Sequence, residues 1–533
     1  MFTRKNKVFS DCFKEDALKK LFILFFIFLA ATVVEPDRAS AEKAFKTDIR
    51  IHLPAKPRPV NRMLLGNNIQ WVDRGDELLQ SGSLNFFPQT LKKVRRMGPT
   101  VLRYPGGSLS DHYHWQKGIG AMAQRKKCNR FNDNRKDTVL FGTVEFLELC
   151  RQAGAEPLIT VNVVTGSVKE AVEWVKFTNS GRLRSKTGKL LPVVKYWEIG
   201  NEPYLIEESR RDLALTPEEY AGRANRFIKA MRSARPDIRV GIPLRSDSLG
   251  GIPATPMQGF NEKVLLGLTE PFDFVCLHNA YMPFHYKGGT DDLSLFQSAM
   301  AATRVVKQDI EATRSILKKH YPEKKIRLAL TEYNALFTIG RGKTDGYISS
   351  LAASIYLADL IRMLSFEDDV LMANYWSLTG NWFFGTLDQT GCPRPSFSLL
   401  SCLNKIFRGH HLHVDIDCPK FDSKTVGFVP AQRDVPLVSA IGTFNEGRIA
   451  LLLINKHPDL PSKVVLAFKQ TADIHIEAVS EMHWPSMFSS GPKSKTSTWK
   501  KIDIRASGST FDLRLKPHSI TLLEARTGGQ PDK

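Results

Sequence analysis

Short apolar runs alternate with helical periods of hydrophobic residues between about Met63 and Trp376. Runs of this length, bounded by turn residues, are typical of buried strands. Apolar residues that recur every three or four positions in the intervening segments indicate amphipathic helices. The candidate strands are Met63–Asn67, Thr100–Tyr104, Glu156–Asn162, Val193–Gly200, Ile238–Pro243, Phe272–His278, Ile326–Thr331 and Val370–Trp376.

Three of the intervening helices carry end signals. Ser167 with Glu170, and Thr216 with Glu219, have the spacing of capped helix starts, and Gly154 is placed to end a helix. Eight strands interleaved with helices predict an α/β fold, a (β/α)8 TIM barrel over residues 62–405. A doubly wound open sheet is the alternative, but no glycine-rich phosphate-binding fingerprint follows the first strand.

The pattern changes after about Ile406, where strand-like runs follow one another without a long helical period. Such a series predicts a β-sandwich domain over residues 406–533. An alternating segment, Thr47–Leu53, precedes the barrel, and we expect residues 42–61 to supply a strand that pairs with this sandwich. The candidate strands of the sandwich are Thr425–Val429, Val438–Thr443, Arg448–Ile454, Ser462–Phe468, His475–Val479 and Ser519–Ala525.

The first 41 residues have the layout of a secretory signal peptide. Basic residues precede an apolar run, Leu21–Val34, and Ala39-Ser40-Ala41 follows as a small-x-small cleavage site. The run has 14 residues, fewer than the roughly 20 that a membrane-spanning helix needs. We therefore expect a secreted or periplasmic protein without stable membrane insertion after cleavage; an uncleaved anchor is the alternative.

A formal net charge of +20 raises the question of an acidic partner. The basic residues are scattered, and no helix-turn-helix or zinc-finger motif accompanies them, so a nucleic-acid partner is not expected. A solvated basic surface is the favoured interpretation, with affinity for an acidic polysaccharide second. The cysteines form no CxxC pairs, which argues against a zinc site, while a disulfide among Cys392, Cys402 and Cys418 stays open.

Two distant segments end in a carboxylate. Glu202 follows the fourth predicted strand in Trp197-Glu198-Ile199-Gly200-Asn201-Glu202-Pro203, and Glu332 ends the seventh in Leu330-Thr331-Glu332-Tyr333. In a (β/α)8 barrel, functional residues lie at the carboxyl ends of the strands. Two carboxylates there can divide the work of a glycosidase between proton transfer and nucleophilic attack. Glu198, four residues earlier, is expected to be a buried structural partner of a basic side chain.

Other polar and aromatic residues occupy the same predicted strand ends. Asn201 could bind a sugar hydroxyl, and Arg103 could hold a carboxylate ionised, although a structural ion pair is an equal alternative. His278 is more often a core residue than a ligand, whereas a nearby Tyr281 phenol would favour a charged nucleophile.

Three further candidates complete the predicted sugar site. Asn67 lies at the end of the first strand, and Trp376 and Trp115 could offer flat faces to a sugar ring, with core packing as an even alternative for Trp115. His112 and His114 lack the spacing of metal ligands, so we expect neither a metal nor a cofactor.

These residues resemble the retaining glycoside hydrolases of clan A, and within them the family 51 α-L-arabinofuranosidases. The matching stretches are Arg103–Gly107, His114–Gly120, Phe141–Thr143, Glu145–Leu147, Gly154–Pro157, Trp197–Pro203 and Thr331–Tyr333. The resemblance implies that Glu202 is the acid/base, that Glu332 is the nucleophile, that Asn201 binds a substrate hydroxyl and that Arg103 and Tyr281 support the nucleophile. It also implies a barrel with a C-terminal β-sandwich.

The chain departs from this family at two points. The spacing in Leu277-His278-Asn279-Ala280-Tyr281 is unusual, and Leu65-Gly66-Asn67-Asn68 lacks the acidic residue that often follows the first strand. Related β-xylosidases and heparanase-like β-glucuronidases share the Asn-Glu-Pro tip. The expected activity is release of arabinose from plant-type polysaccharides or oligosaccharides; those two activities, and a non-catalytic glycan-binding protein, are the alternatives.

Overall fold

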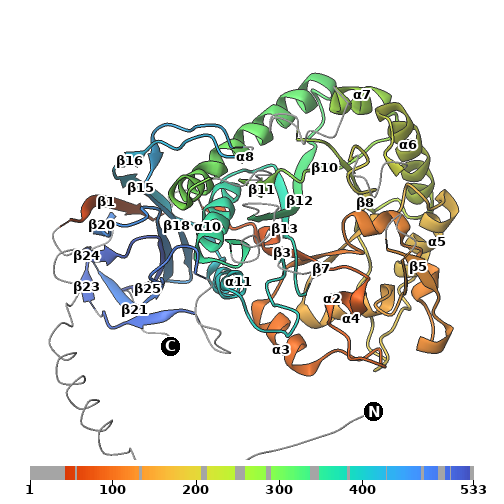
Figure 1. Cartoon of the computed structure of the whole chain (residues 1–533), viewed down its shortest axis with the longest axis horizontal. Coiled ribbons are helices and arrows are strands. Elements are labelled where there is room, and N and C mark those ends of the chain that lie inside the picture. Colours follow the sequence, from red (N-terminus) through yellow and green to blue (C-terminus); the bar gives the residue numbers. More distant parts are fainter. Residues whose placement is uncertain are drawn as a thin grey trace, which may run out of the picture. The chain divides into compact units, whose positions relative to one another are not determined.

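The computed structural model (Figure 1) describes residues 43–53, 57–130, 135–205, 213–246, 259–283, 290–335, 347–380, 384–427, 429–469, 473–489, 498–504 and 506–528. The predicted signal peptide lies outside these residues. The elements described below belong to one compact unit, Phe45–Lys533.

Eight parallel strands close into a barrel, as the hydrophobic pattern predicts. They follow one another around the barrel in chain order, and pairing between β10 and β12 closes the ring. A short additional strand, β11 (Ala280–Met282), extends the pairing along β12. The eight strands are β3 (Gly66–Asn68), β4 (Val101–Tyr104), β7 (Glu156–Val161), β8 (Tyr196–Ile199), β9 (Arg239–Pro243), β10 (Phe274–Cys276), β12 (Arg327–Ala335) and β13 (Val370–Tyr375).

Helices alternate with these strands, and their ends carry the predicted caps. The Ser167 hydroxyl accepts a hydrogen bond from the Glu170 backbone amide, and Thr216 and Glu219 form a reciprocal capping box. Gly154 ends its helix in the left-handed conformation, at φ 70°. The helices are α3 (Pro88–Met97), α4 (Thr143–Ala153), α5 (Val168–Thr178), α6 (Pro217–Ala234), α7 (Phe260–Gly267), α8 (Asp292–His320), α10 (Leu351–Ser365) and α11 (Pro395–Ile406).

The inside of the barrel changes from apolar to polar along the strands. Val101, Leu158, Phe274, Ala329 and Met372 form an apolar cluster near the amino-terminal ends of their strands. Because side chains on one face of a strand recur every second residue, the next inward positions lie closer to the carboxyl ends. Those positions hold Arg103, Thr160, Thr331 and Asn374. Glu198 of β8 and His278, which follows the end of β10, contact the same layer. The barrel thus has an apolar floor beneath a layer of polar and charged groups.

Two sheets form the sandwich that follows the barrel. One has the order β15-β1-β20-β24, and the other runs β2-β14-β18-β19-β25-β21-β22 with β23 beside β21. The N-terminal strand β1 pairs in parallel with β20 and antiparallel with β15. The bounds are β1 (Phe45–His52), β2 (Arg58–Pro59), β14 (His410–His411), β15 (His413–Asp417), β18 (Val438–Asn445), β19 (Arg448–Asn455), β20 (Ser462–Lys469), β21 (Ile474–Met482), β22 (Lys500–Ile502), β23 (Ala506–Gly508), β24 (Thr510–Leu515) and β25 (Ser519–Thr527).

Some details of the sandwich differ from the sequence-based expectation. The described residues of the segment Thr425–Val429 form only an isolated bridge between Val426 and Val429, so the strand predicted there is wrong. Strand β24 was not predicted, although its residues alternate strictly between exposed and buried. All six described cysteines are free thiols, including Cys392, Cys402 and Cys418. Within the described ranges, no helix combines the length and the apolarity that crossing a membrane requires.

A buried ion cluster links the barrel to the sandwich. Asp359 of α10 lies 2.6 Å from Arg362 Nε and 3.4 Å from Lys456 Nζ, and its carboxylate also accepts a 2.7 Å hydrogen bond from Ser439 of β18. Burial alone would raise the pKa of Asp359, but the two cations outweigh it and hold the pKa well below its usual value. Asp359 is therefore ionised, and it compensates the charge of a lysine side chain that is only 3% exposed.

We predict that Asp359→Ala lowers the free energy of unfolding by about 3–5 kcal/mol, because it leaves Lys456 buried without its counter-ion. The matched control is Asp368→Ala, which removes a 2.7 Å ion pair with Arg58 from a carboxylate that is 90% exposed and should cost at most about 1 kcal/mol. Urea unfolding measures both values. Equal losses would show that the buried cluster does not stabilise the fold.

Candidate active site

The carboxyl end of β8 turns sharply and places Asn201 and Glu202 beside the barrel opening. Gly200 has φ 87° and Glu202 has φ 40°, both in the left-handed region. A side chain at position 200 would meet Val163 Cγ2 at 2.6 Å, so only glycine fits this turn. The turn leaves Asn201 buried at 1% exposure, whereas the Glu202 side chain remains 16% exposed.

An irregularity in β12 brings two consecutive side chains into the same network. The pairing between β12 and β13 shifts register between Leu330 and Tyr333. In a regular strand, Thr331 and Glu332 would point to opposite faces. Here the Thr331 hydroxyl donates a 2.8 Å hydrogen bond to Glu198, and the Glu332 carboxylate accepts a 2.7 Å bond from Arg103.

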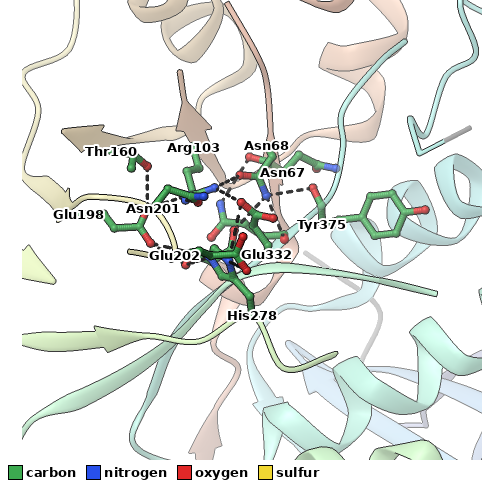
Figure 2. Close-up of polar contacts among 12 residues, drawn as sticks. Asn67, Asn68, Arg103, Thr160, Glu198, Asn201, Glu202, His278, Glu332 and Tyr375 are labelled. Atoms are coloured by element: carbon green, nitrogen blue, oxygen red, sulfur yellow. Dashed lines mark hydrogen bonds and ion pairs between the residues drawn. The ribbon is translucent and has the colours of Figure 1, made fainter. Parts of the chain in front are cut away.

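Arg103 connects the polar groups that the strands bring together (Figure 2). Its guanidinium donates hydrogen bonds to Glu198 at 2.6 Å, Glu332 at 2.7 Å, Asn201 at 2.8 Å and Asn68 at 3.0 Å. Burial would lower the pKa of Arg103, but Glu198 and Glu332 outweigh it and raise this pKa above its ordinary value. One fully buried cation thus fixes two carboxylates that come from different strands.

Glu332 receives a hydrogen bond on each carboxylate oxygen. Arg103 donates to Oε1, and the Tyr281 hydroxyl donates to Oε2 at 2.9 Å. Burial, together with the charge of Glu332, raises the pKa of Tyr281 well above its usual value, so the phenol keeps its proton. Two donors favour the ionised form of a carboxylate, which is the form that can attack an electrophilic carbon.

The backbone of Gly107 passes close to Glu332 and Trp376. A Cβ atom at position 107 would lie 2.9 Å from Glu332 Oε1 and 3.2 Å from Trp376 Cη2. The indole of Trp376 therefore borders the same space as the Glu332 carboxylate. That is the position expected of an aromatic wall beside a sugar ring.

His278 lies between the two strand-end glutamates. Its Nδ1 atom is 3.1 Å from Glu202 Oε1 and 3.9 Å from Glu332 Oε1. The two Oε1 atoms are therefore at most about 7 Å apart, which is compatible with the roughly 5–5.5 Å spacing of the carboxyl groups in retaining glycosidases.

Seven of the nine predicted site residues lie together in one region of the structure, and the other two lie elsewhere. Those that meet are Arg103, Asn201, Glu202, His278, Tyr281, Glu332 and Trp376.

Trp115 belongs to the outer wall rather than to this region. Its indole N–H donates a 3.0 Å hydrogen bond to the Glu170 carbonyl, and its ring packs on Trp174 and Phe177 of α5. The core-packing alternative therefore describes Trp115. Its loop position in the sequence carries no sign of this packing, because the contact partners lie more than fifty residues away.

Asn67 is displaced from the network by strand alternation. Strand β3 ends at Asn68, and the Asn68 amide occupies the inward position, donating to the Thr331 carbonyl and accepting from Arg103. Asn67 contributes its backbone carbonyl, which accepts a hydrogen bond from Asn374. The predicted strand ended one residue too early, at Asn67. A shift of one residue along a strand moves a side chain to the opposite face.

Three polar residues in the network were not predicted as site residues. Asn68 and Thr331 follow from strand alternation once the strand ends are known, and Thr160 is the inward residue after Leu158. Glu198 is the buried partner of Arg103, as expected. Among the residues that the structure describes, no group of three or more His, Cys, Asp and Glu side chains could hold a metal ion.

Comparison with known proteins finds similarity to one group of enzymes. Residues 93–249 match the family model "alpha-L-arabinofuranosidase 1 domain". A probable α-L-arabinofuranosidase C of Aspergillus terreus is 27% identical over 75% of this chain and 83% of its own length. An intracellular exo-α-L-arabinofuranosidase of Bacteroides ovatus is 26% identical over 81% of this chain and 84% of its own.

Solved structures share the fold. The arabinose complex of the Thermotoga maritima α-L-arabinofuranosidase superposes with a TM-score of 0.76 and 22% identity, covering 90% of this chain and 99% of that one. A family 51 α-L-arabinofuranosidase of Thermotoga petrophila gives a TM-score of 0.74 and 22% identity, covering 90% of this chain and 100% of that one. The chain is thus a glycoside hydrolase, similar to the clan A enzymes around family 51.

Proposed function

We propose that this enzyme is a retaining α-L-arabinofuranosidase in which Glu202 is the acid/base and Glu332 the nucleophile. The observation that carries the proposal is the meeting of both strand-end glutamates at His278 Nδ1, at 3.1 and 3.9 Å. The sugar assignment rests on the relatives, which are named arabinofuranosidases in a fungus and in a bacterium. The substrate class is an arabinose-bearing polysaccharide or oligosaccharide of plant type.

The proposed reaction has two steps. In the first, a Glu332 carboxylate oxygen bonds to the anomeric carbon, the glycosidic bond breaks, and Glu202 gives its proton to the leaving oxygen. In the second, Glu202 takes a proton from water, the water oxygen bonds to the anomeric carbon, and the bond to Glu332 breaks. The sugar leaves with its original configuration.

Arg103 and Tyr281 position the proposed nucleophile, Glu332, and stabilise its charge. Their hydrogen bonds hold both oxygens of Glu332 in place before attack, so no rotational freedom is lost during the reaction. The donors also stabilise the carboxylate that departs from the sugar in the second step. Arg103 also holds the amide oxygen of Asn201 and so orients the side chain that we propose binds a substrate hydroxyl.

A panel of nitrophenyl glycosides tests the sugar assignment. We expect the highest kcat/KM on the α-L-arabinofuranoside, and much lower values on the β-xyloside, β-glucoside and β-glucuronide. With methanol as the acceptor, NMR should show a methyl arabinofuranoside that retains the α configuration. Preference for the xyloside or the glucuronide would replace the sugar assignment, and an inverted product would overturn the retaining mechanism. Glu332→Ala is the inactive control.

Glu202→Ala tests the acid role. We predict a loss of about a hundred-fold or more in kcat/KM on arabinosides with poor leaving groups, because their departure needs a proton. An activated aryl arabinofuranoside needs little protonation, so its bond cleavage should slow by less than about tenfold. Kinetics on a series of leaving groups measure the difference. Equal losses across the series would contradict the acid assignment.

We also propose that the enzyme is exported. The basic, apolar and small-x-small order of residues 1–41 supports a cleaved signal peptide. Amino-terminal sequencing of protein from the native host should begin at Glu42. Retention of the first residues in a membrane fraction would favour the anchor instead.

A further inference from the structure

The network contains a third carboxylate, Glu198, that the proposed reaction does not use. Its side chain is fully buried and accepts hydrogen bonds from Arg103 Nε at 2.6 Å, the Thr160 hydroxyl at 2.6 Å and the Thr331 hydroxyl at 2.8 Å. Burial alone would raise the pKa of Glu198, but Arg103 and His278 outweigh it, and the pKa is lowered. Glu198 is thus ionised and can only accept hydrogen bonds.

The direction of the Thr331 hydroxyl follows from this. Its single proton points to Glu198, so Thr331 Oγ1 has only lone pairs to offer to its other neighbour. That neighbour is His278 Nε2, at 2.9 Å. The contact is therefore an Nε2–H donating to Thr331, and the imidazole carries a proton on Nε2.

The opposite ring nitrogen faces the proposed acid. Nδ1 of His278 lies 3.1 Å from Glu202 Oε1. Glu332 Oε1, at 3.9 Å, lies farther from Nδ1. Because Thr331 fixes the proton on Nε2, the Nδ1 atom of a neutral His278 carries a lone pair that faces Glu202. That lone pair can accept a hydrogen bond from Glu202 only when the Glu202 carboxyl group is protonated.

We propose that Glu198, Thr331 and His278 form a relay that fixes the histidine tautomer and thereby keeps Glu202 in its protonated, acid form. The inference rests on the acid/base role proposed for Glu202. Glu198, Thr331 and His278 are positioning residues, since they act on the substrate through Glu202. The reverse tautomer would place an N–H opposite Glu202 and favour the carboxylate, which cannot protonate a leaving group.

Charged groups from several elements face the ring of His278. Glu332 at 3.9 Å, Glu198 at 4.0 Å, Glu202 and Arg103 surround the ring. Burial would lower the pKa of His278, but Glu332 and Glu202 outweigh it and raise the pKa.

The remaining titratable neighbours, Tyr281 and Cys276, stay neutral because burial raises both pKa values. A proton lying between Nδ1 and Glu202 belongs to the pair, and the anionic surroundings retain it as the pH rises.

Two valine substitutions distinguish the relay from an effect that comes only from losing a hydrogen bond to Glu198. Thr331→Val removes the hydroxyl that connects Glu198 with His278, whereas Thr160→Val removes a 2.6 Å hydrogen bond to the other Glu198 oxygen, from a hydroxyl for which the structure shows no hydrogen bond to the histidine. In Thr331→Val, the tautomer with the proton on Nδ1 is favoured over the one with the proton on Nε2, because Glu202 can accept a hydrogen bond from Nδ1–H and nothing replaces the Thr331 hydroxyl at Nε2. The ionised form of Glu202 then becomes favoured at lower pH.

We expect the alkaline limb of the kcat/KM profile to move down by about one to two pH units in Thr331→Val, the scale of one hydrogen bond to a charged group. Above the shifted limb, the loss should be larger for poor leaving groups than for activated ones. Thr160→Val should keep the wild-type limb, and Thr331→Ser should restore it. A common profile for the two valine variants, or a serine variant that fails to restore the limb, would overturn the relay.

A measurement on the unmodified enzyme covers the case in which a variant does not fold. Spectra of enzyme with 15N-labelled histidine should show Nε2 of His278 protonated across the pH range of activity. An unprotonated Nε2 would overturn the relay without reference to any substrate. Failure of the glycoside panel, by contrast, would remove the proposed function and leave the tautomer assignment standing.

Discussion

The buried guanidinium of Arg103 is the interaction on which the rest of the site depends. A charge at zero exposure is tolerated only when opposite charges and acceptors surround it, because its hydration has been lost. Two carboxylates and two amide oxygens meet this need, and they come from β8, β12, β3 and the turn after β8. Satisfying one cation therefore draws together groups that lie more than two hundred residues apart.

The apolar floor of the barrel lies beneath the Arg103 guanidinium and shields it from water. Five side chains from different strands fill the interior below it and exclude water from one side. Electrostatic interactions strengthen in such surroundings, both for the pairs that form and for any group left unpaired. The same strand alternation that builds the floor positions the polar layer two residues later, so the fold and the site share one periodicity.

That periodicity explains how much could be predicted from the sequence. The eight strands, the caps at Ser167 and Thr216, and the position of Glu202 just after β8 follow from local patterns, and the structure contains them. Glu332 was expected at the end of its strand but lies within β12, which continues to Ala335. The sequence nominated Asn67 instead of Asn68 because the predicted end of the first strand was one residue too early. The pairing of Thr331 with Glu332 on one side could not be predicted, because it arises from a register shift between β12 and β13. The sequence left two alternatives for Trp115, because only the packing of α5 decides where its ring lies.

Gly107 illustrates how closely main chain and chemistry are fitted together. Its α-carbon occupies the gap between an indole and a carboxylate, and even one added methyl group would contact both. The border of the sugar space at this point is peptide backbone, whose position is set by the barrel and not by a rotamer. Efforts to broaden the range of accepted sugars would therefore find more freedom in the flanking loops than at this residue.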